Sequence, residues 1–129
     1  MRMGSTRYAD RQRYEQIIDR YLRDCYAQRT VARVSELAQL LDAPRTYLSK
    51  IIPQLFGKSL GVLLREKQLA EAKRLLELVD PLGMDDIAAA SAFGHRSTFY
   101  RVFRAAFGMT PAEYRRTRSY QLRLDSAPR

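Results

Sequence analysis

The chain has 129 residues, enough for one compact unit or two very small ones with a modest apolar core. Its 23 Lys and Arg residues outnumber its 14 Asp and Glu residues, so the formal net charge is +9. Such an excess on a small protein favours a polyanionic partner such as nucleic acid. Composition alone does not choose between DNA, RNA and an acidic membrane surface.

The single cysteine and the single histidine limit the chemistry available to the chain. Cys25 has no second cysteine to pair with, and His95 lies far away in the sequence, so an intrachain disulfide and a thiolate-rich zinc site are both excluded. No apolar run approaches the roughly 20 residues of a membrane span, and the N-terminus lacks a secretory hydrophobic segment. We therefore expect a cytoplasmic protein with no membrane partner, no metal and no cofactor.

Apolar residues near the N-terminus recur with helical spacing. They predict an amphipathic helix over about residues 10–28, whose buried stripe consists of Tyr14, Ile17, Ile18, Tyr21, Leu22 and Cys25. Cys25 is therefore expected to be a small core side chain rather than a redox group.

Two shorter helices are predicted next. The first covers about residues 34–41, and residues 42–44, which end in proline, separate it from the second. The second helix passes through Leu48 and Ile52. Pro53 removes a backbone donor and clashes with the preceding turn, so we expect this second helix to kink or end there.

The longest helical stretch begins at Leu60, and its apolar residues do not keep to one face. Two apolar sets follow one another along it: Leu60, Leu63 and Leu64, and then Leu69, Ala72 and Leu76. The pattern predicts a helix whose two ends are buried against different partners. Asp80-Pro81 ends this helix, and a short helix over residues 84–91 follows.

Residues 98–116, TFYRVFRAAFGMTPAEYRR, combine an apolar stripe with arginines on another face. The phenylalanines of this region are assigned to the core: Phe93, Phe99, Phe103 and Phe107. Gly108 is the expected left-handed helix stop, and Thr110 and Glu113 have the spacing of a capping box that starts a last helix. Tyr114 is expected to pack inward.

The chain contains an internal repeat. Residues 34–42 align with residues 84–92, and residues 48–59 align with residues 99–110 after one extra residue in the second turn. Each copy pairs a short helix that carries a small alanine with a basic, amphipathic helix that ends at glycine. This is the pattern of a helix-turn-helix.

The repeat predicts an all-α fold of about seven helices, with two helix-turn-helix subdomains joined by a long linker helix. The expected boundaries assign residues 8–59 to the N-terminal helix and the first helix-turn-helix, and residues 60–79 to the linker helix. Residues 80–120 then form the second helix-turn-helix and the C-terminal helix, and residues 121–129 form a flexible tail.

The second half resembles the C-terminal signature of the DNA-binding domain of the AraC/XylS family of bacterial transcription regulators. The matching residues are Ile87-Ala88, Phe93, Ser97, Phe99, Arg101, Phe103, Phe107-Gly108, Thr110-Pro111 and Glu113-Tyr114-Arg115. The whole resemblance covers roughly residues 14–116. It implies a sequence-specific regulator whose two recognition helices enter successive major grooves of double-stranded DNA, at a separation fixed by the linker helix.

The first half departs from the family pattern at three places. Pro53 lies in the last turn of the first recognition helix, and Asp42 stands where the family usually has glycine. Residues 66–68 of the linker replace a more apolar and arginine-rich stretch. The resemblance is therefore weaker over the first helix-turn-helix than over the second.

The repeat indicates candidate base-reading residues. Positions that are exposed in both copies, near the start of each second helix, are expected to meet the major groove of DNA. They form four pairs: Arg45 with Arg96, Thr46 with Ser97, Ser49 with Tyr100, and Lys50 with Arg101. Arg96 and Arg101 are the strongest candidates, since arginine binds the guanine edge with two hydrogen bonds. The alternatives are a phosphate contact or a solvated face for the arginines, and packing on its own helix for Tyr100.

Further residues are candidates for phosphate contacts, which add salt-dependent affinity without sequence information: Lys58, His95, Arg104, Arg115, Arg116 and Arg118. His95 is expected near the start of the second recognition helix, where a phosphate meets free backbone amides. A plain turn residue is the alternative for His95.

Two other classes of function compete with the regulator. A nonspecific nucleic-acid or RNA-binding module is supported by charge alone. An enzyme is not expected, because no nucleophile or carboxylate pair stands in a recognisable arrangement. Double-stranded DNA is the expected partner and RNA polymerase a second candidate. Members of the family typically carry an effector or dimerisation domain before these motifs, so the chain is either a small stand-alone regulator or a fragment of a larger one. With this domain alone, we expect it to bind DNA as a monomer and to be nucleoid-associated.

Overall fold

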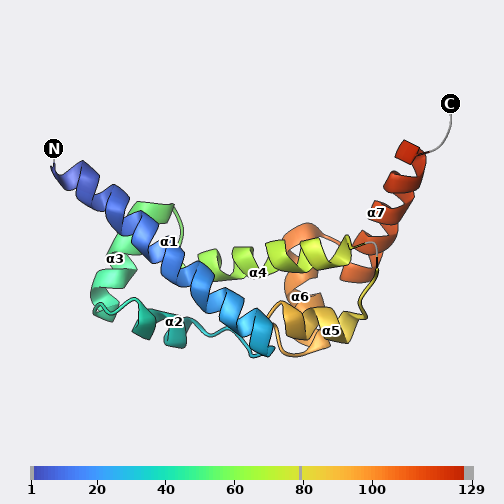
Figure 1. The fold of residues 1–129 in the computed structure, drawn as a ribbon, viewed down its shortest axis with the longest axis horizontal. Coiled ribbons are helices and arrows are strands. Elements are labelled where there is room, and N and C mark those ends of the chain that lie inside the picture. Colours follow the sequence, from blue (N-terminus) through green and yellow to red (C-terminus); the bar gives the residue numbers. More distant parts are fainter. Residues whose placement is uncertain (1, 79, 127–129) are drawn as a thin grey trace.

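The computed structural model describes residues 2–78 and 80–126, and these residues form seven α-helices and no strand (Figure 1). The helices are α1 (Arg2–Gln28), α2 (Val34–Leu40), α3 (Arg45–Phe56), α4 (Leu60–Leu76), α5 (Met84–Ala90), α6 (Arg96–Phe107) and α7 (Pro111–Ser126). The prediction of an all-α fold with about seven helices is confirmed. No helix within the described ranges is both long and apolar enough to span a membrane.

The internal repeat is present in the structure. We call α2 with α3 the first motif and α5 with α6 the second motif. The paired helices have equal lengths, 7 residues for α2 and α5 and 12 residues for α3 and α6. Gly57 and Gly108 end α3 and α6 in the same left-handed conformation, with φ angles of 73° and 74°.

The turns inside the two motifs also match in backbone conformation. Asp42 and Ala92, which align in the repeat, both adopt left-handed φ angles, 53° and 65° respectively. Asp42 thus adopts the conformation for which glycine is usually chosen, and the short polar side chain of aspartate tolerates it better than most. The extra residue of the second turn is followed by Gly94, whose φ angle is also positive.

The core consists of two separate apolar clusters, one at each end of α4. The first cluster combines α1 with the first motif and the start of α4, and its members include Tyr14, Ile18, Leu22, Cys25, Leu37, Leu48, Ile52, Leu63 and Leu64. The second cluster combines the other end of α4 with the second motif: Leu69, Ala72, Leu75, Leu76, Ile87, Ala88, Phe93, Phe99 and Phe103. The prediction that the linker helix is buried at its two ends against different partners is therefore confirmed.

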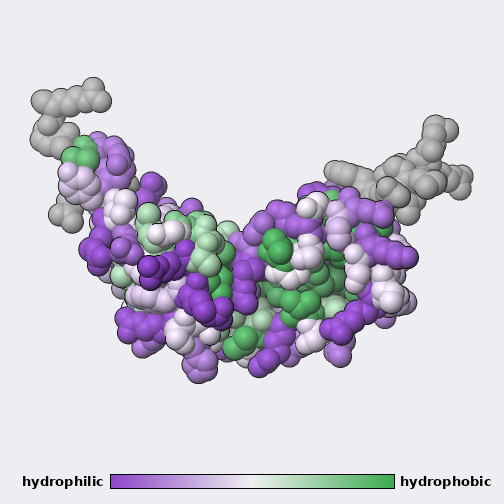
Figure 2. All heavy atoms as spheres, turned by 180° about the vertical axis from the view of Figure 1, so that it is seen from behind, coloured by the Kyte–Doolittle hydropathy of each residue, from purple (hydrophilic) through white to green (hydrophobic). Residues whose placement is uncertain are grey.

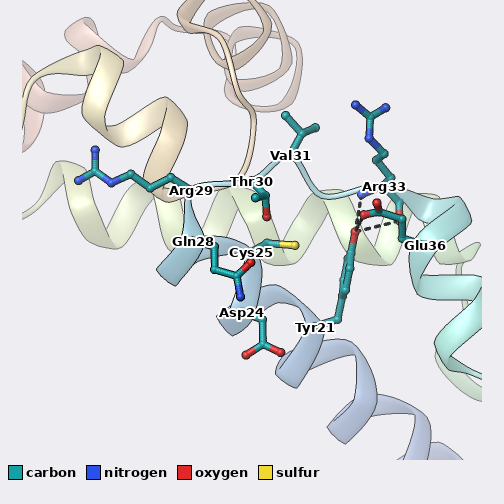
Figure 3. A pocket seen from close by; sticks show the side chains of 9 residues that line it. All are labelled: Tyr21, Asp24, Cys25, Gln28, Arg29, Thr30, Val31, Arg33 and Glu36. Atoms are coloured by element: carbon teal, nitrogen blue, oxygen red, sulfur yellow. Dashed lines mark hydrogen bonds between the residues drawn. The ribbon is translucent and has the colours of Figure 1, made fainter.

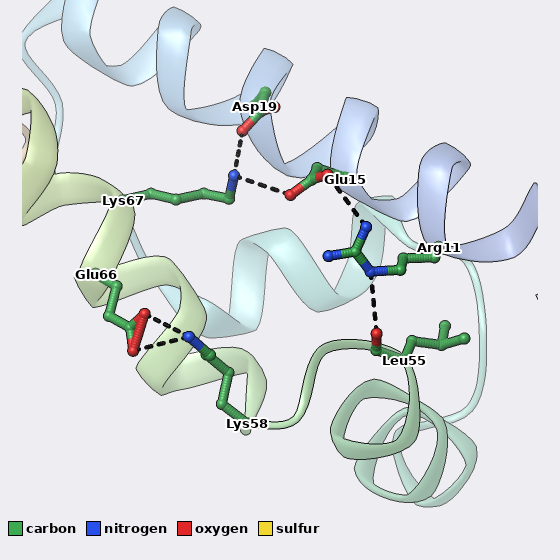
Figure 4. Close-up of polar contacts among 7 residues, drawn as sticks. All are labelled: Arg11, Glu15, Asp19, Leu55, Lys58, Glu66 and Lys67. Atoms are coloured by element: carbon green, nitrogen blue, oxygen red, sulfur yellow. Dashed lines mark hydrogen bonds and ion pairs between the residues drawn. The ribbon is translucent and has the colours of Figure 1, made fainter. Parts of the chain in front are cut away.

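Ion pairs tie α1 to α4 outside the first cluster (Figure 4). Lys67 Nζ lies 2.9 Å from Asp19 Oδ1 and 3.4 Å from Glu15 Oε2. Partial burial opposes the charge on Lys67, but hydrogen bonds to these two carboxylates outweigh it and raise the pKa of Lys67. Residue 67 therefore attaches the linker helix to the N-terminal helix.

The first and last helices extend beyond the predicted boundaries. α1 starts at Arg2 rather than near residue 10, and α7 continues to Ser126 through most of the tail that was expected to be flexible. Residues 127–129 of that tail lie outside the described residues. The extensions carry no apolar periodicity, so the sequence pattern did not indicate them. Within α7, the side chain of Gln121 donates to Asp125 Oδ1 at 3.2 Å.

The sequence predicts that the first recognition helix kinks or ends at Pro53. The structure shows that the helix does not end there. α3 runs on to Phe56, and the carbonyl of Pro53 accepts the N–H of Gly57 at 2.8 Å. Pro53 removes only one donor and lies near the end of the helix on an exposed face. The left-handed Gly57 completes the last turn, which explains why the helix tolerates the proline.

The assignment of Phe107 to the core is wrong. Phe93, Phe99 and Phe103 are buried as predicted, but Phe107 is 38% exposed. It is the last residue of α6, one turn beyond Phe103, so its ring is covered on one side only. The ring lies 4.6 Å from that of Phe103, and Lys73 Nζ lies 4.8 Å from its centroid. Tyr114 does pack against the second cluster, as expected.

The capping box at the start of α7 is confirmed. Glu113 Oε1 accepts the N–H of Thr110 at 2.8 Å, and Thr110 Oγ1 accepts the N–H of Glu113 at 3.1 Å. The hydrogen bond from the Thr110 backbone, helped by the Thr110 side chain and by Arg116 and Arg104, lowers the pKa of Glu113.

The variant E113Q tests this cap. A carboxylate whose pKa is lower in the folded state stabilises the protein above its unfolded pKa, and the stabilisation is lost as the pH falls through the folded pKa. We expect E113Q to lower the Tm at pH 7, and the difference from the unmodified chain to shrink below about pH 4. Thermal unfolding between pH 7 and pH 3 measures it, and a difference that does not change with pH would contradict the assignment.

Candidate nucleic-acid interface

The second helices of the two motifs begin in the same way. Arg45 is the first residue of α3, Arg96 is the first residue of α6, and both side chains are exposed. Their N-caps, Pro44 and His95, form no side-chain capping hydrogen bond. The first-turn N–H groups of both helices are therefore open to an external acceptor, and the positive end of each helix favours an anion there.

Most of the predicted base-reading residues are exposed. Exposed side chains on α3 and α6 include Arg45, Thr46, Ser49, Lys50, Arg96, Ser97 and Arg101. Tyr100 is half-buried against the second cluster, and its ring packs edge-on at 6.0 Å from that of Phe99. Tyr100 thus packs partly on its own helix, the alternative considered for it from the sequence, and its contact with DNA stays a prediction.

Side-chain contacts already orient part of α6. The guanidinium of Arg96 lies 5.6 Å from the ring centroid of Tyr100 and 4.0 Å from a carboxylate oxygen of Asp85. Both contacts are exposed and weak, so they leave the guanidinium of Arg96 charged and available to a ligand.

The corresponding face of α3 is less regular. The hydroxyl of Ser49 donates to the carbonyl of Arg45 at 3.0 Å, so its proton is used within the helix. Arg45, Ser49 and Pro53 border a groove of about 210 Å³ whose other walls include Val34 and Leu60. Figure 2 shows apolar surface gathered in a hollow over the half of the molecule that carries the N-terminal end.

Arg65 of the linker helix belongs with the basic side chains of α6. Its guanidinium lies 5.4 Å from the ring centroid of Phe93. Burial lowers the pKa of Arg65, and the neighbouring positive charge of Arg101 lowers it further. Neither arginine forms an ion pair with a described residue, so both guanidinium groups remain available to an external anion. The sequence analysis missed Arg65 because the linker has no counterpart in the repeat.

The predicted phosphate contacts fall into two groups. Arg104, Arg116 and His95 are exposed. The other three have partners within the protein. Lys58 Nζ lies 2.6 Å from Glu66 (Figure 4), and Arg118 Nε lies 3.4 Å from Glu77.

Arg115 is the third of these and is half-buried. Its Nε donates to the carbonyl of Leu76 at 3.4 Å, and its Nη2 is enclosed without a hydrogen-bond partner among the described residues. It lies at the C-terminal end of α4, where a positive charge is favourable. The structure thus places Arg115 between α4 and α7 rather than in a free cationic surface.

The fold and these exposed helices define a class of protein, one with two helix-turn-helix motifs on a common support. A family model described as a helix-turn-helix domain, of the AraC/XylS type, matches residues 37–117. That range begins within α2 and covers the rest of the first motif, the linker helix and the whole second motif. The chain therefore belongs to the AraC/XylS-type helix-turn-helix family and is a DNA-binding transcription regulator.

Relatives and solved structures agree with this assignment. The probable transcription factor PqrA of Proteus vulgaris is 30% identical over 83 residues, which cover 64% of this chain and 67% of that protein. The C-terminal domain of the response regulator YesN from Fusobacterium nucleatum is similar with a TM-score of 0.70 and 28% identity, over 81% of this chain and 95% of that domain. The DNA-binding domain of AdpA, solved in complex with a target DNA, shares the fold with a TM-score of 0.72 and 22% identity, over 88% and 97% of the two chains.

The positions of Arg115 and Arg116 make a prediction about stability. We expect R115A to lower the free energy of unfolding by about 1 kcal/mol or more, because it removes a partly buried charged donor from the carbonyl of Leu76. R116A removes an exposed side chain and should change the free energy by no more than about 0.5 kcal/mol. Urea unfolding of the two variants compares them, and equal effects would contradict the structural role of Arg115.

Proposed function

We propose that this regulator binds one double-stranded DNA site sequence-specifically, with α3 and α6 in successive major grooves on one side of the duplex. The observation that carries the proposal is the repetition of the whole motif, including helix lengths, left-handed stops and an arginine at the first helical position. A major groove about 12 Å wide admits one helix, and equivalent grooves recur every 34–36 Å. A protein that presents two such helices is suited to contact bases in two consecutive turns of the DNA duplex.

The roles of the side chains follow from their surroundings. Arg96 and Arg101 are the proposed base-reading residues of α6, because both are exposed on the proposed recognition helix. Arg45, Thr46 and Lys50 have the corresponding roles on α3.

Phosphate contacts are proposed for the remaining basic side chains that have no carboxylate partner among the described residues. Arg104, Arg116, His95 and the newly found Arg65 are the candidates, since none forms an ion pair within the described residues. Lys58 and Arg118 must first give up a carboxylate partner, so their contribution is expected to be smaller.

The buried aromatic residues argue against a module that binds single strands by base stacking. Such modules need aromatic rings exposed on a platform. Phe99 and Phe103 are 0% exposed and Phe93 is 3% exposed, so these rings are not available for stacking. Binding without catalysis, as a monomer, is the mode that we propose for this chain.

Selection from a pool of random duplexes tests the proposal. The dissociation constants for the selected duplex and for a scrambled one are then measured at one stated salt concentration. We expect a preference of about 10³-fold or more for the selected duplex. A preference below about tenfold would overturn sequence-specific binding and favour the nonspecific nucleic-acid module.

Substitutions separate base reading from phosphate contacts. R96A and R101A should each weaken binding to the selected duplex by about 1–3 kcal/mol and relax the preference at one base pair. R65A should weaken binding to selected and scrambled duplexes alike and reduce the slope of log K against log salt by about one.

The matched control is R23A. It removes the same charge from an exposed position on α1, beside the groove between α1 and α4. R23A should leave both affinities nearly unchanged. If R96A and R101A behaved like R65A, the proposed base-reading roles would be wrong, whereas sequence-specific binding by other residues would stand.

A further inference from the structure

A loop of the first half of the molecule rests on the turn of the second motif. Residues 29–33 connect α1 to α2, yet the N–H of Ala32 donates to the carbonyl of Ala92 at 3.1 Å. Arg29 Nη1 lies 3.3 Å from Asp86 Oδ1 of α5. Ala92 itself is buried in the first apolar cluster, although it lies in the turn between α5 and α6. α1 thus contacts α5 of the second motif as well as α2 and α3 of the first.

The loop is anchored on its own side by Tyr21. The hydroxyl of Tyr21 accepts the N–H of Arg33 at 2.8 Å and donates to Glu36 Oε1 at 2.7 Å (Figure 3). In the same view Val31 points away from α1, towards the ribbon of the second motif. These hydrogen bonds hold the end of the loop against α1, while Ala32 and Arg29 of the same loop contact the second motif.

Gln68 of the linker helix makes a second attachment at the same turn. It is only 1% exposed, and its Nε2 donates to the carbonyl of Ser91 at 3.2 Å and to that of Ala92 at 3.0 Å. Both N–H groups of the amide are therefore used. The carbonyl of Ala92 accepts from Ala32 and from Gln68 at once, so the loop and the linker helix meet at one atom of the turn.

Gly94 allows the loop to approach this closely. Its φ angle is +87°, and a Cβ atom at this position would lie 2.7 Å from Cγ2 of Val31. Gly108 has a similar φ angle of +74°, but a Cβ atom there would have nothing within 4 Å. The two glycines thus share the backbone conformation, and only Gly94 also has a packing requirement.

We propose that this junction, formed by residues 29–33 and Gln68 on one side and residues 91–94 on the other, sets the distance and angle between α3 and α6. The inference rests on the proposed function. A single helix joins the motifs along the chain, and the loop provides a second connection that prevents rotation about that helix. Gln68 and Gly94 are positioning residues that determine how many base pairs separate the two groups of bases that the chain reads.

One inserted base pair changes the separation of two half-sites by about 3.4 Å and rotates them by roughly 34°, so a rigid reader discriminates spacing. The test uses the selected duplex with zero, one or two base pairs inserted or deleted between its two contacted regions. For the unmodified chain we expect each change of one base pair to weaken binding by about tenfold or more. Q68M keeps the volume of the side chain but removes both hydrogen bonds. G94A adds the colliding methyl group.

For Q68M and G94A we expect the insertion or deletion of one base pair to weaken binding by only about threefold or less, or the spacing that binds best to shift. The double variant V31A/G94A removes the collision and should restore much of the spacing preference. The matched control is G108A, which imposes the same backbone strain in the second motif without a collision. It should weaken binding at every spacing by the same factor.

The outcomes distinguish the inference from the proposed function. A spacing profile identical in the unmodified chain, Q68M and G94A would overturn the inference while two-groove binding stands. Protection of a single groove would show that the proposed function itself had failed.

A measurement on the unmodified chain tests the inference even if Q68M and G94A do not fold. In ¹⁵N relaxation of the unmodified, DNA-free chain, the amides of α3 and α6 should report one common tumbling, and independent tumbling of the two motifs would overturn the inference.

Discussion

Neither helix-turn-helix motif forms a core by itself. The structure depends on the two long helices, α1 and α4, which supply the remaining apolar side chains of the two clusters. α2 and α5 are only 7 residues long, and isolated helices shorter than about 12–15 residues are marginal in water. Their central residues, Leu37 and Ile87, are nevertheless 0% exposed, because α1 and α4 cover them. The position of each recognition helix is therefore a consequence of how its motif packs on these shared supports.

This arrangement explains the mixture of phenylalanines and arginines in α6. One face of the helix supplies Phe99 and Phe103 to the second cluster, so the arginines are left on the other faces. Arg101 then lies near Arg65 of the linker helix, and like charges that gather without a carboxylate partner raise the local positive potential. The same packing that stabilises the helix thus presents its cations to a polyanion.

The sequence predicted the parts of this structure that rest on apolar periodicity. The change of apolar face from Leu63 and Leu64 to Leu69 and Ala72 along α4 predicted that its two ends are buried against different partners, as the two clusters show. The repeat predicted the same helix pair built twice. Helix ends without an apolar period, such as residues 2–9 of α1 and residues 121–126 of α7, are not indicated by such a pattern. Phe107 follows the apolar spacing of its helix, yet only the three-dimensional arrangement shows that the core ends before it.

The base-reading candidates were predictable only where the repeat supplied a second copy for comparison. Arg96 and Arg101 were found in this way, whereas Arg65 and Gln68 lie in the unrepeated linker. Gln68 acts on backbone carbonyls of Ser91 and Ala92, and any residue type presents such carbonyls, so its partners carry no signal in the sequence. The contact of Val31 with Gly94 likewise joins segments that are distant along the chain.

The central claim is that one chain presents two helices to two consecutive major grooves. Hydroxyl-radical footprinting of the chain on its selected duplex tests this claim most directly, because it maps contacts to individual nucleotides without assuming which side chains make them. The account predicts two protected windows whose centres are about 10–11 base pairs apart on the same side of the duplex. A single protected window, or two windows on opposite sides of the duplex, would contradict it.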